Sequence, residues 1–144
     1  MPTKYNNFKV LITRIARGIH KVEEKEMQQI NLKSQHISCL YYLSLSNKLR
    51  AKDIVDMYLE DKGQVSRSLD FLEKNGYILC ESNAPKRYNA YYYLTDMGKK
   101  VAEYISAKID EIVEEVSDFL TPEERKIMYR CLTKIGNNLQ KIDN

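Results

Sequence analysis

Apolar residues recur every three or four positions along most of this chain, and this spacing limits its fold more than any other feature. The spacing is the α-helical period, so the apolar residues fall on one stripe of each helix. Residues that end or bend helices are scarce, with 5 glycines and 3 prolines in 144 residues. The sequence therefore predicts a mostly α protein, with 43% apolar residues to fill the core of one domain or of two small lobes.

The apolar stripes and the residues at their ends predict six helices. They are expected at residues 5–29, 34–46, 51–58, 62–74, 96–120 and 122–142. The fourth helix begins after Asp61, which is spaced with Gln64 as a reciprocal cap, and it ends at Asn75-Gly76, where glycine takes the left-handed conformation. The fifth helix follows the cap Thr95-Asp96, and the sixth follows a capping box, Thr-Pro-Glu-Glu, at residues 121–124.

Between the fourth and fifth helices the period of the sequence changes. Residues 77–82 and 90–95 are rich in Tyr, Ile, Leu and Cys, which suit strands. The segment between them, NAPKRYN, is polar and basic and contains a proline. The sequence therefore predicts a β-hairpin with a charged tip, in the overall order α-α-α-α-β-β-α-α.

Two short helices joined by a tight turn and followed by a hairpin form a winged helix-turn-helix, in which the second helix of the pair enters the major groove of DNA. The helix at 62–74 suits this role because its first turns carry small or hydrogen-bonding residues. Arg67 can bind guanine through two donors, Gln64 can bind adenine, and Ser66 can hold a phosphate together with the free first-turn amides. The opposite, core-facing stripe consists of Val65, Leu69 and Leu72.

The hairpin tip, Lys86-Arg87-Tyr88-Asn89, is expected to lie along the neighbouring DNA backbone or minor groove, where negative potential attracts arginine. Each signal alone is also typical of an ordinary surface helix or of a solvated loop. Their order along the chain, a short helix, a polar-tipped helix and a basic hairpin between long helices, favours DNA binding. The predicted DNA contacts are Lys62, Gly63, Gln64, Ser66, Arg67, Lys86, Arg87, Tyr88 and Asn89.

The same segments resemble those of a known family. The stretch DKGQVSRSLDFLEKNGYI, followed by a basic loop and YYYLTDMGKKVAEYI, resembles the core signature of the multiple-antibiotic-resistance regulator (MarR) family of winged-helix repressors. The shared patterns are V-S-R and L-D-x-L-E in the fourth helix and L-T-x-x-G after the hairpin, and the resemblance extends over the whole chain. It implies a ligand-responsive transcriptional repressor that binds a pseudo-palindromic operator as a homodimer.

The resemblance also implies how the chain is divided. Residues 1–31 and 98–144 would form a helical dimerisation region, in which the terminal helices of both chains interlock, and residues 32–97 would form the DNA-binding domain. Three features depart from the family pattern. Lys86-Arg87-Tyr88 replaces Asp-Arg-Arg in the wing, Cys80 stands where many members have arginine, and His36 stands where many have glutamine. The wing contacts are therefore less well defined than those of the fourth helix.

Charge is distributed unevenly between the helices, although the net charge of only +3 argues against a non-specific nucleic-acid coat protein. Residues 1–22 carry five basic residues and no acid, whereas residues 103–118 carry six acidic residues and one lysine. Such complementary faces favour contact between the first and fifth helices, within one chain or between two. They are equally consistent with two unrelated solvated faces.

Other functional classes have weaker support. The two histidines have no paired nucleophile, and we recognise neither a phosphate-binding Gly loop nor an H-E-x-x-H motif, so no enzyme and no cofactor are expected. A helical protein-interaction module without specific DNA binding remains the alternative. His20, Glu24, His36 and Cys39 have the chemistry of zinc ligands, but exposed or internally bonded side chains are the more common explanation.

Tyrosines suggest where an effector could bind, and cysteines indicate the cellular compartment. Tyr41, Tyr42 and Tyr104 could line an effector cavity between the DNA-binding domain and the long helices, although tyrosines more often lie half-buried in a core. Cys39, Cys80 and Cys131 are odd in number and contain no C-x-x-C pair, which argues against a disulfide framework. A reducing cytoplasm suits such cysteines, and we recognise neither a membrane span nor a signal peptide.

Overall fold

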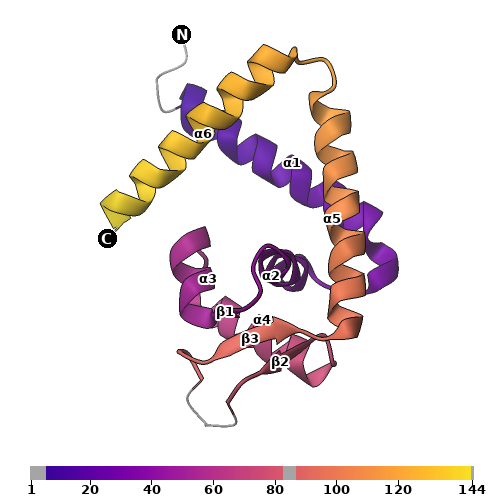
Figure 1. The fold of residues 1–144 in the computed structure, drawn as a ribbon. Helices are drawn as coiled ribbons and strands as arrows, with labels where there is room; N and C mark the ends of the chain where they lie inside the picture. The colour runs from indigo at the N-terminus through magenta and orange to yellow at the C-terminus, as the bar shows by residue number, and fades with distance from the viewer. Residues whose placement is uncertain (1–5, 83–86, 144) are drawn as a thin grey trace.

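The computed structural model describes residues 6–82 and 87–143, and over these residues the chain is mostly helical, as predicted (Figure 1). Its elements in chain order are the π-helical turn η1 (Asn6–Val10), α1 (Leu11–Glu26), the 3-10 turn η2 (Gln28–Ile30), α2 (Ser34–Ser44), β1 (Leu49–Arg50), α3 (Ala51–Tyr58), α4 (Lys62–Lys74), β2 (Ile78–Cys80), β3 (Tyr91–Leu94), α5 (Asp96–Ser117) and α6 (Pro122–Asp143). Within these ranges no helix is both long and apolar enough to span a membrane.

The predicted helix caps are confirmed with one correction. The Gln64 amide donates to the Asp61 carboxylate at 2.9 Å, and Gly76 follows α4 with a φ of 82°. Before α6, Thr121 and Glu124 cap each other reciprocally, with distances of 3.0 and 3.1 Å. The reciprocal half of the Asp61 cap is wrong, because the Gln64 side chain donates instead to Gln35 Oε1 at 3.3 Å.

A three-stranded antiparallel sheet takes the place of the predicted two-stranded hairpin. Its strand order is β1-β3-β2, with Leu49 opposite Tyr92 and Ile78 opposite Leu94. The predicted element order is therefore wrong in omitting β1. A strand of two residues is too short for an alternating pattern to appear in sequence, and its pairing with β3 depends on the tertiary fold.

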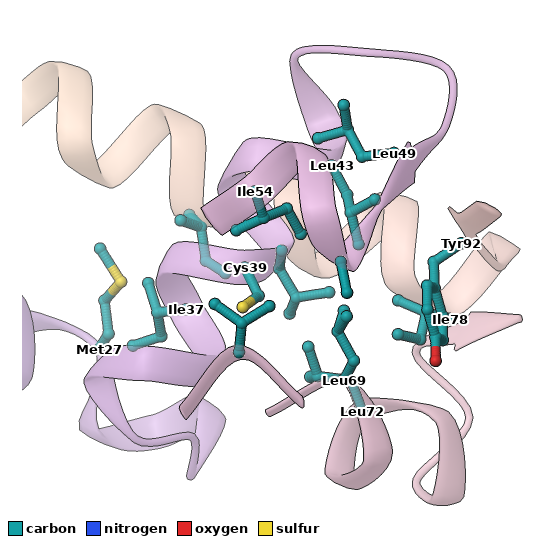
Figure 2. Close-up of a cluster of buried hydrophobic side chains, with 14 residues drawn as sticks. Met27, Ile37, Cys39, Leu43, Leu49, Ile54, Leu69, Leu72, Ile78 and Tyr92 are labelled. Atoms are coloured by element: carbon teal, nitrogen blue, oxygen red, sulfur yellow. The ribbon is translucent and has the colours of Figure 1, made fainter. Parts of the chain in front are cut away.

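One hydrophobic core holds α2, α3, α4 and the sheet together as a compact unit, which we call the head (Figure 2). Ile54 of α3, Leu72 of α4 and Ile78 of β2 are completely buried in it. Met27, which follows α1, and Ile105 of α5 also belong to this core, so the end of α1 and the first half of α5 are anchored to the head. Burial of a large aliphatic side chain contributes roughly 1.5–3 kcal/mol, which makes this core the main source of the head's stability.

The long helices extend away from the head (Figure 1). α5 leaves the sheet, and α6 turns back towards α3, where Gln140 Nε2 donates to the Asp56 carbonyl at 2.7 Å. Over the described residues no side chain of α1 or α6 is buried. Both helices are amphipathic, and Ile15 of α1 and Ile142 of α6 remain 58% and 74% exposed. The apolar stripes predicted for these helices are present, but one chain alone does not cover them.

The L-T-x-x-G segment forms a tight joint between the sheet and α5. The Thr95 hydroxyl accepts from the Gly98 amide at 3.0 Å and lies 2.7 Å from the Gly76 carbonyl oxygen. A Cβ atom at Gly98 would lie 1.9 Å from the Tyr77 carbonyl oxygen, well inside van der Waals contact. Glycine is therefore required here by the close approach of two main-chain segments.

Candidate nucleic-acid interface

α4 has the two faces that the sequence predicts. Val65, Leu69 and Leu72 are at most 2% exposed and attach the helix to the head. On the outer side, Lys62, Ser66 and Arg67 are exposed at the beginning of the helix. The Asp61 cap occupies the Gln64 amide, whereas the amides that precede it in the first turn have no acceptor within the helix and can bind an anion at the positive end of the helix dipole.

Gly63 and Arg67 are arranged as a pair. The guanidinium of Arg67 folds back along the helix, and its Nη1 would lie 3.1 Å from a Cβ atom at position 63. Glycine at this position therefore leaves room for the arginine as well as for an approaching ligand. The bare first turn predicted from the sequence is present, and the arginine side chain occupies part of that space.

Gln64 is less free than predicted. Its side chain is half-buried, and its amide nitrogen donates to Gln35 of α2 at 3.3 Å. A base would have to compete with Gln35 for this donor. Gln35 itself was not predicted, since nothing in the sequence relates it to a residue in another helix.

The wing is connected to α4 near both ends of the helix. Arg87 Nη1 donates to the Glu73 carboxylate at 2.8 Å and to the Ser82 carbonyl at 3.3 Å. Hydrogen bonding to Glu73 is the main cause that raises the pKa of Arg87 above its ordinary value. At the other end, Lys62 Nζ lies 4.5 Å from the centroid of the Tyr88 ring, a cation–π contact.

Two other wing residues, Asn89 and Lys86, were predicted to contact DNA. Asn89 is exposed, whereas the predicted contact Lys86 lies outside the described residues. The structure thus brings Lys62 and Tyr88 together, and it holds Arg87 in an internal ion pair. Glu73, which makes that pair, was not predicted, although an acid two residues before Asn75 at the end of α4 could have been noticed.

Two further basic residues lie beside the wing and were also missed. Lys48 Nζ and the Arg50 guanidinium lie 4.4 and 5.5 Å from the centroid of the Tyr91 ring. Lys48 also pairs with Glu81 at 3.3 Å, and Arg50 pairs with Asp53 at 2.8 Å. The available sequence signal was the run of three cations at 48, 50 and 52, but the strand β1 that places two of them beside β3 was not predicted.

Among the described residues, the four candidates for zinc ligands do not gather into a metal site. His36 stacks on Phe71 with centroids 4.0 Å apart, and burial, followed by the charge of Lys33, lowers its pKa. Cys39 is buried, and burial with the charge of Glu60 raises the pKa of its thiol to about 12. His20 Nδ1 lies 3.1 Å from Ser34 Oγ. No group of three or more metal-ligating side chains occurs among the residues that the structure describes.

A polar cavity of about 230 Å³ lies behind the first turns of α4, between this helix and α2. Of the tyrosines considered for an effector cavity, Tyr42 lines it and donates to Glu60 at 3.1 Å. Tyr104 instead accepts a hydrogen bond from Gln29, and Tyr41 packs against the core. Gln64 also lines this cavity, so it contacts both the candidate interface and the interior of the head.

No protein-family model matches this chain, and no curated protein matches its sequence. Solved structures do match it. A Listeria monocytogenes protein named as a MarR family transcriptional regulator, complexed with a 26mer DNA, has a TM-score of 0.85 and 21% identity, over 98% of this chain and 91% of that chain. A MarR family regulator from Silicibacter pomeroyi has a TM-score of 0.78 and 24% identity, over 89% of this chain and 86% of that chain.

A third similar structure contains a small molecule. NadR in complex with 4-hydroxyphenylacetate has a TM-score of 0.79 and 19% identity, over 94% of this chain and 98% of that chain. With identities of 24% or less in these three comparisons, the shared property is the fold. The arrangement of helices, sheet and wing described here is therefore the one found in those proteins.

Proposed function

We propose that this chain, which has the winged-helix fold of MarR-family transcriptional regulators, is itself a sequence-specific DNA-binding regulator. The observation that carries the proposal is the division of α4 into a buried apolar face and an exposed first turn with Lys62, Ser66 and Arg67, beside a wing joined to the same helix. The similar structure solved with a 26mer DNA supports it. We propose that the protein acts in the cytoplasm and has no enzymatic activity.

In this proposal α4 enters the major groove, Arg67 reads guanine and Ser66 holds a phosphate. Gly63 allows close approach, while Gln64 reads adenine when its bond to Gln35 is released. Wing residues Lys86 to Asn89 lie along the adjacent backbone, and there Arg87 has a second role in holding the wing to Glu73.

We further propose that residues 32–97 form the DNA-binding domain and that residues 1–31 and 98–144 form a homodimer interface. The uncovered apolar faces of α1 and α6 support this, since exposed apolar patches of this kind mark interaction sites. Charge supports it as well. Among the described residues no ion pair joins the basic face of α1, which includes Arg14 and Arg17, to the acidic face of α5, which includes Asp110 and Glu115. A second copy can bring the two faces together.

A two-fold dimer would bind a pseudo-palindromic operator whose half-sites are about 34 Å apart, or one turn of DNA. We propose that the protein is a repressor that a small-molecule effector releases from this operator. The presence of 4-hydroxyphenylacetate in the similar NadR structure supports the involvement of an effector.

The test is selection of bound duplexes from a random pool by the full chain, followed by affinity measurements at several salt concentrations. Arg67→Ala should relax base preference at a defined position of the selected site by about 1–3 kcal/mol. Lys86→Ala should weaken binding to all duplexes alike and reduce the salt slope by about one. Lys126→Ala, which removes an equal charge from an exposed position on α6, is the matched control.

Unchanged base preference in Arg67→Ala would contradict the assignment of Arg67 as the base-reading residue. A monomeric mass in solution at micromolar concentration would contradict the dimer.

The apolar faces of α1 and α6 also favour a second candidate function, docking of a different protein without DNA recognition. The salt series separates the two. A DNA-binding protein loses affinity steeply as salt rises, because phosphate contacts release counterions, whereas a protein partner held by apolar faces does not. Absence of any selected duplex, together with a stable complex at high salt, would favour the second function.

A further inference from the structure

The cavity between α2 and α4 has room and chemistry for a ligand. A cavity needs a volume of about 10–15 Å³ to hold one water molecule. The volume of about 230 Å³ found here can therefore accommodate a small organic molecule. Hydroxyl and amide side chains from α2 and α4 form most of its lining, and Glu60 contributes a carboxylate from the turn between α3 and α4. Cys39 and Val65 of the apolar core complete the lining, so the cavity presents both polar and apolar groups.

Ser68 provides a specific sign of a missing binding partner. Its side chain lines the cavity and is 1% exposed, yet within the described ranges its hydroxyl has no hydrogen-bond partner. The Cys39 thiol, a weak hydrogen-bonding group, lies close enough to the Ser68 hydroxyl to be affected by it, and this interaction opposes the rise in the pKa of the thiol. A buried polar group left unpaired is costly, so buried hydroxyls are nearly always bonded. A ligand in the cavity can supply the missing partner.

Glu60 determines the charge that such a ligand should carry. Tyr42 donates to its Oε1 at 3.1 Å, but no ion pair of Glu60 occurs in the described part of the chain. Neither lysine nor arginine lines the cavity within those residues, and the histidine that does, His20, is exposed and lies 3.7 Å from the Glu23 carboxylate. A partly buried carboxylate without a cationic partner attracts a positively charged group.

We propose that this cavity binds a small organic cation, whose ammonium or amidinium group contacts Glu60 and whose other donor contacts Ser68. Tyr42 and the amides of Gln35 and Gln64 would complete its hydrogen bonds. This ligand class is opposite in charge to the 4-hydroxyphenylacetate in the NadR structure, because a ligand carboxylate placed here would be repelled by Glu60.

The position of the cavity connects it to DNA binding, and this part of the inference rests on the proposed function. Gln64 lines the cavity, and Glu60 directly precedes Asp61, the residue that caps α4. A cation bound to Glu60 would therefore act at the turn that positions the first turn of α4. Occupation of the cavity should change the affinity for the selected duplex.

The test uses three probes of similar length that differ in their end groups, 1,4-diaminobutane, 1,4-butanediol and succinate. Calorimetric titration of the full chain without DNA should show that the diamine binds, that the diol binds at least tenfold more weakly, and that succinate does not bind. Glu60→Gln should lower the affinity for the diamine at least tenfold, and Ser68→Ala should lower it several-fold. Glu103→Gln, which removes an exposed carboxylate from α5, should leave it unchanged.

Equal binding of the three probes, absence of diamine binding at millimolar concentration, or full affinity in a folded Glu60→Gln would each overturn the proposal. If Glu60→Gln does not fold, the ranking of the probes on the unmodified chain decides. These titrations contain no DNA, so a failure of the proposed DNA binding leaves their outcome intact. With the selected duplex added, the diamine should shift DNA affinity in the unmodified chain and not in Glu60→Gln, and equal shifts in both would overturn the coupling.

Discussion

The guanidinium of Arg87 donates to the carboxylate of Glu73 at 2.8 Å and thereby joins the wing to the outer side of α4. With the Lys62–Tyr88 contact near the other end of the helix, the wing has two attachments to the element that is proposed to enter the DNA groove. The two parts of the interface therefore move together.

The strength of this attachment can be measured by a double-mutant cycle with Arg87→Gln and Glu73→Gln. Both side chains are less than a third exposed, so the coupling free energy in urea unfolding should be about 1 kcal/mol. The Lys48–Glu81 pair, with side chains 48% and 46% exposed, is the control and should show a coupling below about 0.5 kcal/mol. Equal coupling in the two pairs would show that the wing is not specifically held.

Gly98 should not tolerate a side chain. Gly98→Ala places a Cβ atom against the Tyr77 carbonyl oxygen, so α5 or the sheet must shift, and the free energy of unfolding should fall by at least about 2 kcal/mol. Gly18 in α1 has no heavy atom within 4 Å of an added Cβ, and Gly18→Ala should gain up to about 1 kcal/mol from helix propensity. Similar unfolding midpoints for the two variants would contradict this account.

Stability should fall at mildly acidic pH because of His36. Burial, followed by the charge of Lys33, lowers the pKa of His36 in the folded chain below its unfolded value of about 6.5. The unfolded chain therefore takes up a proton first as pH falls, and stability is lost progressively from about pH 6.5 towards the folded pKa. Urea midpoints at pH 7.5 and 5.5 should differ less for His36→Gln than for the unmodified chain. His20→Gln, the control, should lose as much stability between pH 7.5 and 5.5 as the unmodified chain does. An equally large loss in His36→Gln would refute the assignment to His36.

The cap of α4 should affect both stability and DNA affinity. Asp61→Ala removes the acceptor of the Gln64 amide and should cost about 0.5–2 kcal/mol of unfolding free energy. Since the first turn then frays, affinity for the selected duplex should fall as well. Asp61→Asn preserves the acceptor and should retain most of both properties. Loss of affinity in Asp61→Asn equal to that in Asp61→Ala would show that charge, and not capping, is responsible.

Local signals allowed most of the fold to be predicted from the sequence. The caps at Asp61, Thr95 and Thr121 and the glycine at 76 act over three or four residues, so they are legible without tertiary structure, and the structure confirms them. The strand β1 was missed because its two residues become a strand only through pairing with β3.

The candidate interface was likewise predictable where it depends on local sequence and unpredictable where it depends on contacts between elements. The two faces of α4 were predictable because they follow from helical periodicity. The engagement of Gln64 by Gln35 and of Arg87 by Glu73 was not, since each bond joins residues from different elements. The unpaired Ser68 hydroxyl could not be predicted either, because nothing in the sequence distinguishes this serine from any other serine in a helix.

The contact between Gly98 and the Tyr77 carbonyl has a mechanical consequence. Main-chain atoms of the two segments come together at this point, so no side chain lies between Gly98 and the Tyr77 carbonyl to absorb a displacement. A rotation of α5, imposed by a contact at its far end, would therefore be transmitted directly to the sheet and the wing. In the proposed dimer, the position of each wing would then follow the orientation of its own α5 helix.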